Sequence, residues 1–293
     1  MESSDLLSEQ DVSSAQNLGK RTPTLVIIEA PSLLAEALAE TLAKALVPTL
    51  AARNSDVRVL SPASASWVLD EIDQQIVVPS SLTPLVRNVL VILNADQMST
   101  RNAEHLLRAT EEPPAPTTFI FCVGSANNVL ATLRGRAQEI LRPHLDKARL
   151  AGVLTKAGLS TDVATSAVEL LGDQSALLRD LAQTPEGSQL ATDFISHVSE
   201  PDRARPASTA AAVAAIITDI VANVPGAFGE DPAPTRLRAR ERALAASVIR
   251  SWTAAGPDFR GRAAGAELAK DVLDRNGPTN LALAAALAQS TTF

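Results

Sequence analysis

Four short runs of apolar residues in the first half of the chain constrain its fold more than any other feature. These runs are TLVIIE (24–29), VRVL (57–60), NVLVIL (88–93) and TTFIFCV (117–123), and a stretch able to form a helix separates each run from the next. Short runs rich in β-branched residues are typical of buried strands. Because strands that alternate with helices form parallel sheets covered on both faces, the sequence predicts an α/β domain here.

The rest of the chain has a different pattern. No convincing strand follows Ile140, and apolar residues recur at helical spacing over residues 145–197. Residues 199–207 mix proline with charge and are the best linker candidate, and the Ala-rich remainder is typical of helices. The start lacks apolar periodicity, which predicts a tail with a weak chance of one short helix. The expected organisation is a tail (1–22), an α/β core (23–144), a small helical domain (145–200) and a C-terminal helical domain (201–293).

Composition and charge exclude several classes of function. Cys122 is the only cysteine and the three histidines are scattered, so a Cys-rich zinc module is excluded and no bound metal is expected. The net charge of -7 argues against free-standing nucleic-acid binding, which depends mainly on Lys and Arg contacts to phosphates. No run approaches the ~20 apolar residues that span a bilayer, and the acidic start lacks a signal pattern. A cytoplasmic location is therefore expected.

The segment after the first predicted strand lacks the residues of a phosphate-binding loop. Such a loop needs glycines, which let backbone N–H groups approach phosphates, and a lysine that reaches the terminal phosphate. Residues 29–46 contain no glycine, and their only lysine, Lys44, lies well inside the predicted helix. The third predicted strand ends in Leu93 and Asn94, where active ATPases carry an acidic pair. Both losses predict that the chain does not bind nucleotide in the usual way, and no cofactor is expected.

A long motif occupies residues 94–140, from NADQM through NAEHLLRATEEPP and TTFIFCV to LATLRGR. It resembles the clamp-loader branch of the AAA+ family, in which an Asn-Ala-Leu-Leu-Lys-x-Leu-Glu-Glu-Pro-Pro helix precedes a Leu-Leu-x-Thr-Ile-Arg-Ser-Arg-Cys segment. Weaker similarities extend over most of residues 23–293. The residues that match in order are Asn102, Ala103, Leu106, Leu107, Glu111, Glu112, Pro113, Pro114, Phe119, Leu130, Thr132, Leu133, Arg134 and Arg136.

The resemblance implies an AAA+ core domain, a helical lid domain and a helical collar domain. Within this family, the delta prime subunit commonly has a degenerate phosphate loop, so the loss of both ATPase motifs resembles delta prime more than the ATP-hydrolysing gamma/tau subunits. The implied role is an accessory subunit of a DNA polymerase III holoenzyme, with no activity alone. The implied partners are gamma/tau-like ATPase subunits, a delta-like subunit, the sliding clamp and primer-template DNA within the complex, and no membrane.

Two arginines carry the site that the resemblance implies. Arg136 corresponds to an arginine finger that reaches the γ-phosphate of ATP held by a neighbouring subunit, and Arg134 corresponds to a support of the same loop. The alternative for Arg136 is a surface arginine paired with a carboxylate, the default for most arginines. Glu111 and Glu112 are interpreted as structural, because Pro113 ends their helix. The flanking Ser and Cys of the motif are replaced by glycine and alanine.

Two other interpretations stay open. One is a divergent gamma/tau-like clamp-loader ATPase with an unusual nucleotide pocket, which ATP binding to the isolated chain would reveal. The other is an AAA+ pseudo-ATPase interaction module outside replication, which its co-purifying partners would reveal.

Overall fold

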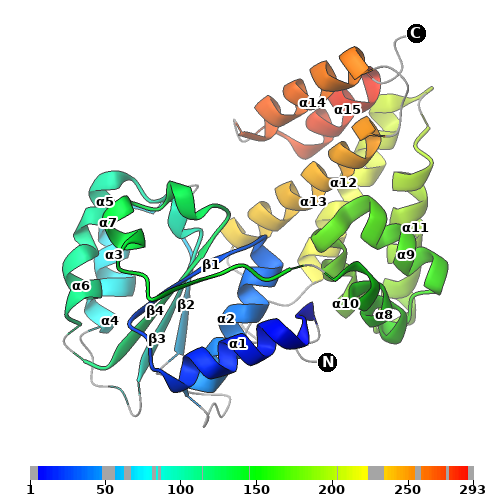
Figure 1. Cartoon of the computed structure of the whole chain (residues 1–293). Helices are drawn as coiled ribbons and strands as arrows, with labels where there is room; N and C mark the ends of the chain where they lie inside the picture. The colour runs from blue at the N-terminus through cyan, green and yellow to red at the C-terminus, as the bar shows by residue number, and fades with distance from the viewer. Residues whose placement is uncertain are drawn as a thin grey trace. The chain divides into compact units, whose positions relative to one another are not determined.

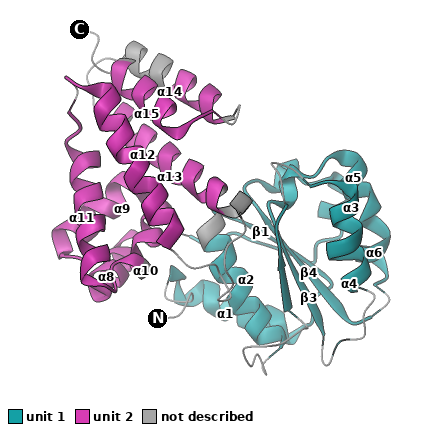
Figure 2. Ribbon diagram, turned by 180° about the vertical axis from the view of Figure 1, so that it is seen from behind, with its two compact units in different colours: residues 1–146, 226–235 teal, residues 147–225, 236–293 magenta. Residues whose placement is uncertain are grey.

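The chain forms two compact units, which Figure 2 shows in separate colours. Unit 1 contains residues 1–146 with 226–235, and unit 2 contains residues 147–225 with 236–293. The domain boundaries expected from the sequence, including the division into lid and collar, stay predictions. The computed structural model describes residues 6–47, 57–62, 67–80, 84, 87–113, 115–144, 146–202, 204–223, 234–254, 259–274 and 277–289.

Unit 1 is built on a parallel five-stranded sheet with the strand order β2-β3-β4-β1-β5. The four predicted strands are confirmed, and a fifth strand of three residues was missed. That strand pairs with β1 and is too short to give an alternating pattern, with Ile140 at its centre. The strands are β1 (Leu25–Glu29), β2 (Val57–Leu60), β3 (Asn88–Leu93), β4 (Thr117–Val123) and β5 (Glu139–Leu141).

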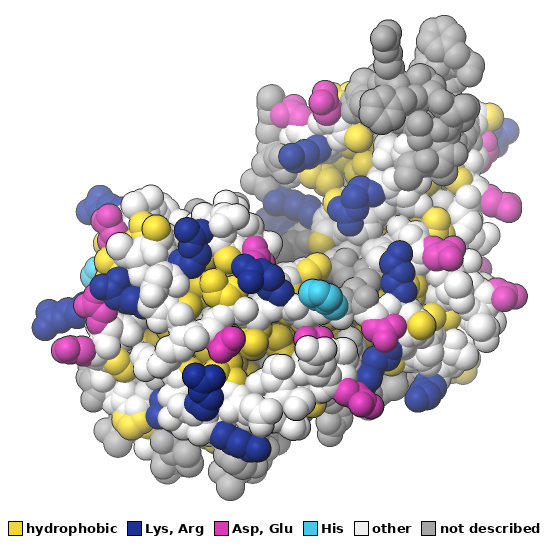
Figure 3. Space-filling view, in the orientation of Figure 1, with side chains coloured by type: hydrophobic (Ala, Val, Ile, Leu, Met, Phe, Trp, Pro, Cys, Tyr) yellow, Lys and Arg dark blue, Asp and Glu magenta, His cyan; other side chains and the backbone are white. Residues whose placement is uncertain are grey.

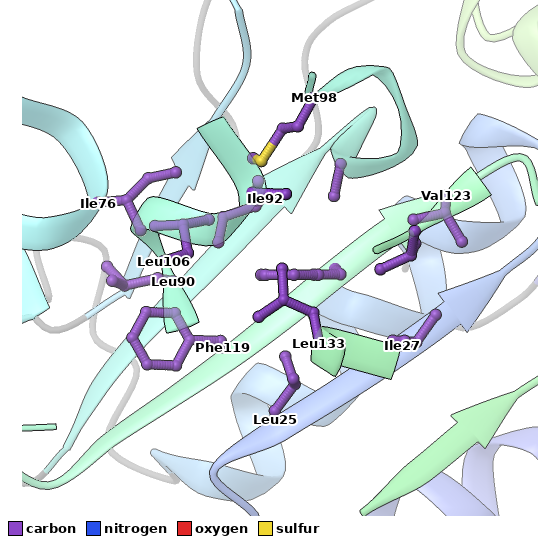
Figure 4. Packing of buried hydrophobic residues seen from close by; sticks show 14 of the residues in the cluster. Leu25, Ile27, Ile76, Leu90, Ile92, Met98, Leu106, Phe119, Val123 and Leu133 are labelled. Carbon is purple, nitrogen blue, oxygen red and sulfur yellow. The ribbon is translucent and has the colours of Figure 1, made fainter. Parts of the chain in front are cut away.

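Alternate residues of the central strands point to opposite faces of the sheet. On one face, side chains from β1, β3 and β4 form a buried cluster that includes Leu25, Leu90 and Phe119 (Figure 4). The helical elements that contribute to this cluster or lie beside it are α3 (Leu69–Ile72), the π-helix η2 (Asp73–Val77), α4 (Val78–Ser80), α5 (Thr100–His105), α6 (Leu107–Glu111) and α7 (Ala131–Arg134).

The other face of the sheet is covered by α2 (Ser32–Leu46), with α1 (Glu9–Lys20) packed against it (Figure 1). The Ala/Leu pattern of α2 buries most of its length, and the Cys122 thiol of β4 lies 3.8 Å from the carbonyl oxygen of Ala35 in this helix. Helices on both faces bury the three central strands β1, β3 and β4, apart from the half-buried Glu29, which confirms the expectation of a covered parallel sheet.

The first helix differs from the tail expected for residues 1–22. Ser8 begins α1, and its hydroxyl oxygen accepts a hydrogen bond from the backbone N–H of Asp11 at 3.1 Å. Ala15 and Leu18 are buried, and Gly19 lies so close to α2 that an added Cβ would be 2.6 Å from the Cβ of Ala45. The helix is polar on average and its closest approach to α2 is made by a glycine, which carries little hydrophobic signal, so the apolar pattern does not reveal it.

Unit 2 is helical throughout its described residues. Two of its helices begin at polar capping residues. The side-chain oxygens of Ser160 and Thr184 accept hydrogen bonds from the backbone N–H groups three residues later, at the starts of α9 and α11. The buried Nε1 of Trp252 in α13 donates to the carbonyl oxygen of Val198 in α11 at 2.9 Å. The helices are α8 (Lys147–Ala157), α9 (Thr161–Leu171), the 3-10 helix η5 (Gly172–Leu177), α10 (Leu178–Leu181), α11 (Pro185–Ser199), α12 (Pro206–Asn223), α13 (Pro234–Ala254), α14 (Phe259–Asp274) and α15 (Thr279–Gln289).

Helix α12 is the one helix among the described residues that is long and apolar enough to cross a membrane by length and composition. Core helices of soluble proteins pass the same test, and the side chains of Val213, Ile217 and Ile220 are fully buried against the rest of unit 2. A single helix of this kind is weak evidence for a membrane span.

Candidate functional site

The candidate site lies at the carboxyl ends of β1 and β4. From β1 the chain crosses through α2 on one face of the sheet to β2, whereas from β4 it crosses through α7 on the other face to β5. Connections that leave two neighbouring strands in opposite directions open a crevice at their carboxyl ends, which is where open α/β sheets bind ligands. Nucleotide-binding groups are therefore expected at the carboxyl ends of β1 and β4.

The connection from β1 to α2 consists of two residues, Ala30 and Pro31. The N–H of Ala30 donates to the carbonyl oxygen of Val123 in β4 at 3.1 Å, and Pro31 has no N–H. A phosphate-binding loop needs several consecutive backbone N–H groups turned toward the ligand. Neither of these two residues has a free N–H group to offer a phosphate.

Neither the last residue of β3 nor the residue that follows it is acidic. Leu93 is buried, and its carbonyl oxygen accepts a hydrogen bond from the indole N–H of Trp67 at 3.2 Å. Asn94 follows with a left-handed backbone, φ 52°, and turns the chain into the 3-10 helix η3 (Ala95–Gln97). Asparagine tolerates this conformation better than most residues, so a turn explains its presence without a role in chemistry.

Two carboxylates hold the loop that follows β4. The Oδ2 atom of Asp96 accepts from the backbone N–H groups of Gly124 at 3.1 Å and Ser125 at 3.2 Å. The Oε1 atom of Glu29, the last residue of β1, accepts from the N–H of Ala126 at 2.9 Å. Three consecutive N–H groups at the mouth of the crevice are thus bound by carboxylates of the chain itself, so they are not free to bind an anion.

Glu29 also joins β1 to the end of β5. Its Oε2 atom accepts from Nε of Arg142 at 2.6 Å. The hydrogen bond from the Ala126 backbone lowers the pKa of the Glu29 carboxyl below its ordinary value, Arg142 and Arg134 lower it further, and burial opposes them. Glu29 therefore stays charged and links three strand ends.

Arg134 braces this same loop. Its Nη1 atom donates to the carbonyl oxygen of Ala126 at 3.3 Å and to Oδ1 of Asn127 at 3.0 Å. The half-buried side chain begins at the end of α7, whose buried Leu133 packs into the core cluster. Arg134 thus joins the end of α7 to the loop after β4, and its role as the support of a finger stays a prediction.

Arg136 lies just beyond the end of α7 and is more exposed. Its Nη1 atom donates to the carbonyl oxygen of Thr132 at 2.9 Å, and its Nη2 atom forms an ion pair with Oε1 of Glu111 at the end of α6. About 38% of the Arg136 side chain remains accessible to solvent. The structure therefore pairs this arginine with a carboxylate, as surface arginines commonly are, and leaves part of its guanidinium on the surface.

Sequence reasoning singled out the two arginines and did not single out Glu29 or Asp96. The signal for Glu29 is its place as the final residue of a buried strand, where a charged side chain reaches the carboxyl edge of the sheet. Asp96 belongs to the ADQM turn, and its role there is to accept from the loop after β4. Both residues act between segments distant in sequence, so only the fold brings out their function.

The other reactive side chains lie away from this crevice. Cys122 is buried under α2. The exposed imidazole of His105 lies on the face of the sheet opposite to α2, with its Nε2 atom 2.5 Å from Oδ1 of Asp73. Among the residues that the structure describes, no cluster of three or more His, Cys, Asp or Glu side chains could hold a metal ion.

Charged side chains of both signs are mixed on the one face that Figure 3 shows. On the face drawn in Figure 3, Lys and Arg are scattered among Asp and Glu. Affinity for nucleic acid rests on many contacts between basic side chains and phosphates. This face and the net charge of -7 give no ground for strong DNA binding by the chain alone.

Comparison with known protein families finds a match in the part of the chain that contains the motif of residues 94–140. Residues 37–145 match the family model described as "DNA polymerase III, delta subunit". This match contains the whole motif and the Arg136 segment. In this region the chain is similar to the clamp-loader subunits of DNA polymerase III.

One solved structure shares the fold of this chain over nearly its whole length. A DNA polymerase III gamma subunit-related protein of Thermotoga maritima is 13% identical with a TM-score of 0.53, and the alignment covers 96% of this chain and 100% of that one. A variant of RuvB from Thermotoga maritima is 14% identical with a TM-score of 0.47, covering 94% of this chain and 81% of that one. Among curated proteins no relative matches the sequence. The AAA+ fold class predicted from the sequence is confirmed.

Proposed function

We propose that the chain is a delta prime-like subunit of a DNA polymerase III clamp loader, one that neither binds nor hydrolyses ATP and that supplies Arg136 to the ATP site of a neighbouring subunit. Its partners would be gamma/tau-like ATPase subunits, a delta-like subunit, the sliding clamp and primer-template DNA within the cytoplasmic complex. Residues 145–200 would form the lid domain, and residues 201–293 would join the collar that holds the subunits together.

The observation that carries the proposal is the two-residue connection between β1 and α2. The N–H of Ala30 is bonded to Val123 and Pro31 has none, so the two residues that connect β1 to α2 offer no N–H donor to a phosphate. The loop after β4 adds to this, because Asp96 and Glu29 accept from its N–H groups and would repel a triphosphate. Leu93 cannot bind magnesium, which such chemistry needs.

The exposed position of Arg136 supports the second part of the proposal. The side chain starts from a short helix anchored in the core by Leu133 and ends partly exposed, as a group that reaches another molecule must. A guanidinium stabilises the charge that develops on a transferring phosphoryl group, and a finger supplied in trans is worth about 10³–10⁵ in rate in related NTPases. Arg134 would hold the loop from which the finger extends.

The first test is ATP binding to the isolated chain, measured by equilibrium dialysis with ATP and Mg²⁺. The proposal expects no saturable binding at millimolar ATP. Saturable micromolar binding would overturn it and favour a divergent gamma/tau-like ATPase.

The second test is the steady-state ATPase rate of the reconstituted loader with clamp and primed DNA, comparing wild type with Arg136→Ala. The proposal expects the loader with Arg136→Ala to assemble normally. Its kcat should fall by the contribution of the ATP site that Arg136 serves. A loader whose rate is indifferent to the substitution would overturn the finger. Failure of the chain to join a loader at all would favour an AAA+ interaction module outside replication.

A further inference from the structure

The carboxylate that touches Arg136 comes from the Glu-Glu-Pro-Pro motif. Helix α6 ends at Glu111, because Glu112 takes an extended conformation before Pro113 and the proline cannot continue the helix. This stop fixes the carboxylate of Glu111 at the last helical position. From there it forms the ion pair with Nη2 of Arg136, 25 residues further along the chain.

The backbone of α7 holds the other branch of the same guanidinium. Nη1 donates to the carbonyl oxygen of Thr132, one of the last carbonyl groups of α7 and without a helical partner of its own. The cation also lies at the helix C-terminus, where a positive charge is favoured. Arg136 is therefore held from two sides, and these two elements, α6 and α7, pack on the same core cluster.

A guanidinium has five N–H groups in a fixed fork, and the two contacts with Thr132 and Glu111 occupy one on each branch. The remaining N–H groups can bind a phosphate while both contacts are kept. An arginine that is already restricted loses less rotamer entropy when it binds its target. The pair therefore prepares the side chain for a ligand.

We propose that Glu111 is a positioning residue for Arg136: its carboxylate holds the guanidinium in the orientation that meets a phosphate of the neighbouring subunit's ATP. This inference rests on the proposed function of Arg136 as a finger. A latch that keeps Arg136 away from ATP is the opposite role, and the exposure of the pair argues against it. Exposed ion pairs are weak, so one carboxylate cannot keep the free N–H groups of Arg136 from the larger charge of a triphosphate.

The test compares Glu111→Gln with Glu112→Gln in the reconstituted loader with clamp and primed DNA. Both substitutions remove one negative charge from neighbouring exposed residues, and only Glu111 contacts Arg136. We expect Glu111→Gln to lower the ATPase kcat of the site served by about two- to fivefold with KM unchanged, the range given by the worth of an exposed pair. Glu112→Gln should leave kcat within error of wild type.

A double-mutant cycle separates positioning from a general structural effect. If Glu111 acts through Arg136, Glu111→Gln causes no further loss in the Arg136→Ala background. An equal loss in both backgrounds, or an increase in kcat on Glu111→Gln, would overturn the proposal. Thermal melting of each variant checks that the fold is intact.

The two proposals fail in distinguishable ways. If Arg136→Ala leaves the loader's rate unchanged, the finger itself is wrong and Glu111 has nothing to position. If Arg136→Ala lowers the rate while Glu111→Gln matches Glu112→Gln, only the positioning role is wrong. In the isolated chain, the NMR signal of the Arg136 Nε–H should shift and broaden on Glu111→Gln and stay in place on Glu112→Gln; an unchanged signal would also count against positioning.

Discussion

The amide Nδ2 of Asn102 in α5 lies 2.7 Å from the carbonyl oxygen of Trp67, the residue whose indole N–H in turn donates to Leu93 at the end of β3. A single amide thus connects the motif helix to the segment before α3, and through it to the sheet. The asparagine of the clamp-loader motif therefore has a structural function here: it satisfies a carbonyl group next to the fully buried Trp67.

Replacing Asn102 with alanine should destabilise unit 1. The substitution leaves the Trp67 carbonyl oxygen without its partner, and an unsatisfied group of this kind costs about 1–3 kcal/mol. Urea unfolding followed by tryptophan fluorescence would measure the loss. Arg101→Ala, an exposed neighbour on the same helix, is the control and should change the free energy of unfolding by less than about 0.5 kcal/mol. Equal effects of the two substitutions would contradict the role given to Asn102.

Two glycines in helices should respond in opposite ways to substitution by alanine. An alanine Cβ at position 19 would be 2.6 Å from the Cβ of Ala45, whereas one at position 152 would meet no atom within 4 Å. Gly152→Ala should stabilise the protein by about 0.5–1 kcal/mol, because glycine is a poor helix former. Gly19→Ala should destabilise it by about 1–3 kcal/mol, because α1 and α2 must move apart.

Thermal melting of the two variants measures this difference. The double variant Gly19→Ala with Ala45→Gly should recover only part of the loss, because a glycine within α2 itself costs about 0.5–1 kcal/mol. A Gly19→Ala protein as stable as Gly152→Ala would mean that α1 does not pack on α2 as described.

The sequence could predict the sheet because its strands are continuous apolar runs, and their limits follow from the residues that flank them. It could not predict β5, where three half-buried residues at an edge give no periodic signal. It also missed α1 as a packed element, because Gly19 and Ala15 make their contacts by being small. Small residues carry little hydrophobic signal, although they allow two helices to approach closely.

The same contrast holds for the site. Arg134 and Arg136 could be singled out because they lie in a motif of fixed spacing. The carboxylates that surround them could not, since Glu29 and Asp96 reach the loop after β4 from 97 and 28 residues away. Glu111 was visible in the motif and was interpreted as structural, and only the fold brings it to Arg136. Pairings between distant segments depend on the order of the strands, which local pattern does not encode.

Glu29 should make the stability of unit 1 depend on pH. Its pKa in the folded chain is below the ordinary value of 4.5, chiefly because it accepts from the Ala126 N–H. A carboxyl whose pKa is depressed by folding stabilises the protein above its unfolded pKa, and this contribution is lost as the pH falls through the folded pKa. The stability difference between wild type and Glu29→Gln should therefore be largest at pH 6–7 and shrink below about pH 4.5.

Urea unfolding of both proteins between pH 7 and pH 3 would test this, with the exposed Glu104→Gln as the control for a lost charge. A difference between wild type and Glu29→Gln that stays constant over this range would show that the hydrogen bond, and not the charge of Glu29, stabilises the loop.

The two arginines of the motif should separate into one that stabilises the fold and one that does not. Arg134 donates to the backbone of Ala126 and to Asn127, so its loss leaves a half-buried carbonyl group without a donor and should cost about 1–2 kcal/mol. Arg136 is paired at the surface with Glu111, and exposed pairs are worth about 0.2–1 kcal/mol. In thermal melting, the Tm of Arg134→Ala should lie below that of wild type, and the Tm of Arg136→Ala should lie close to it. If Arg136→Ala were the less stable of the two, the arginine would be a structural element of unit 1, and a loss of loader activity in that variant could no longer be attributed to a finger.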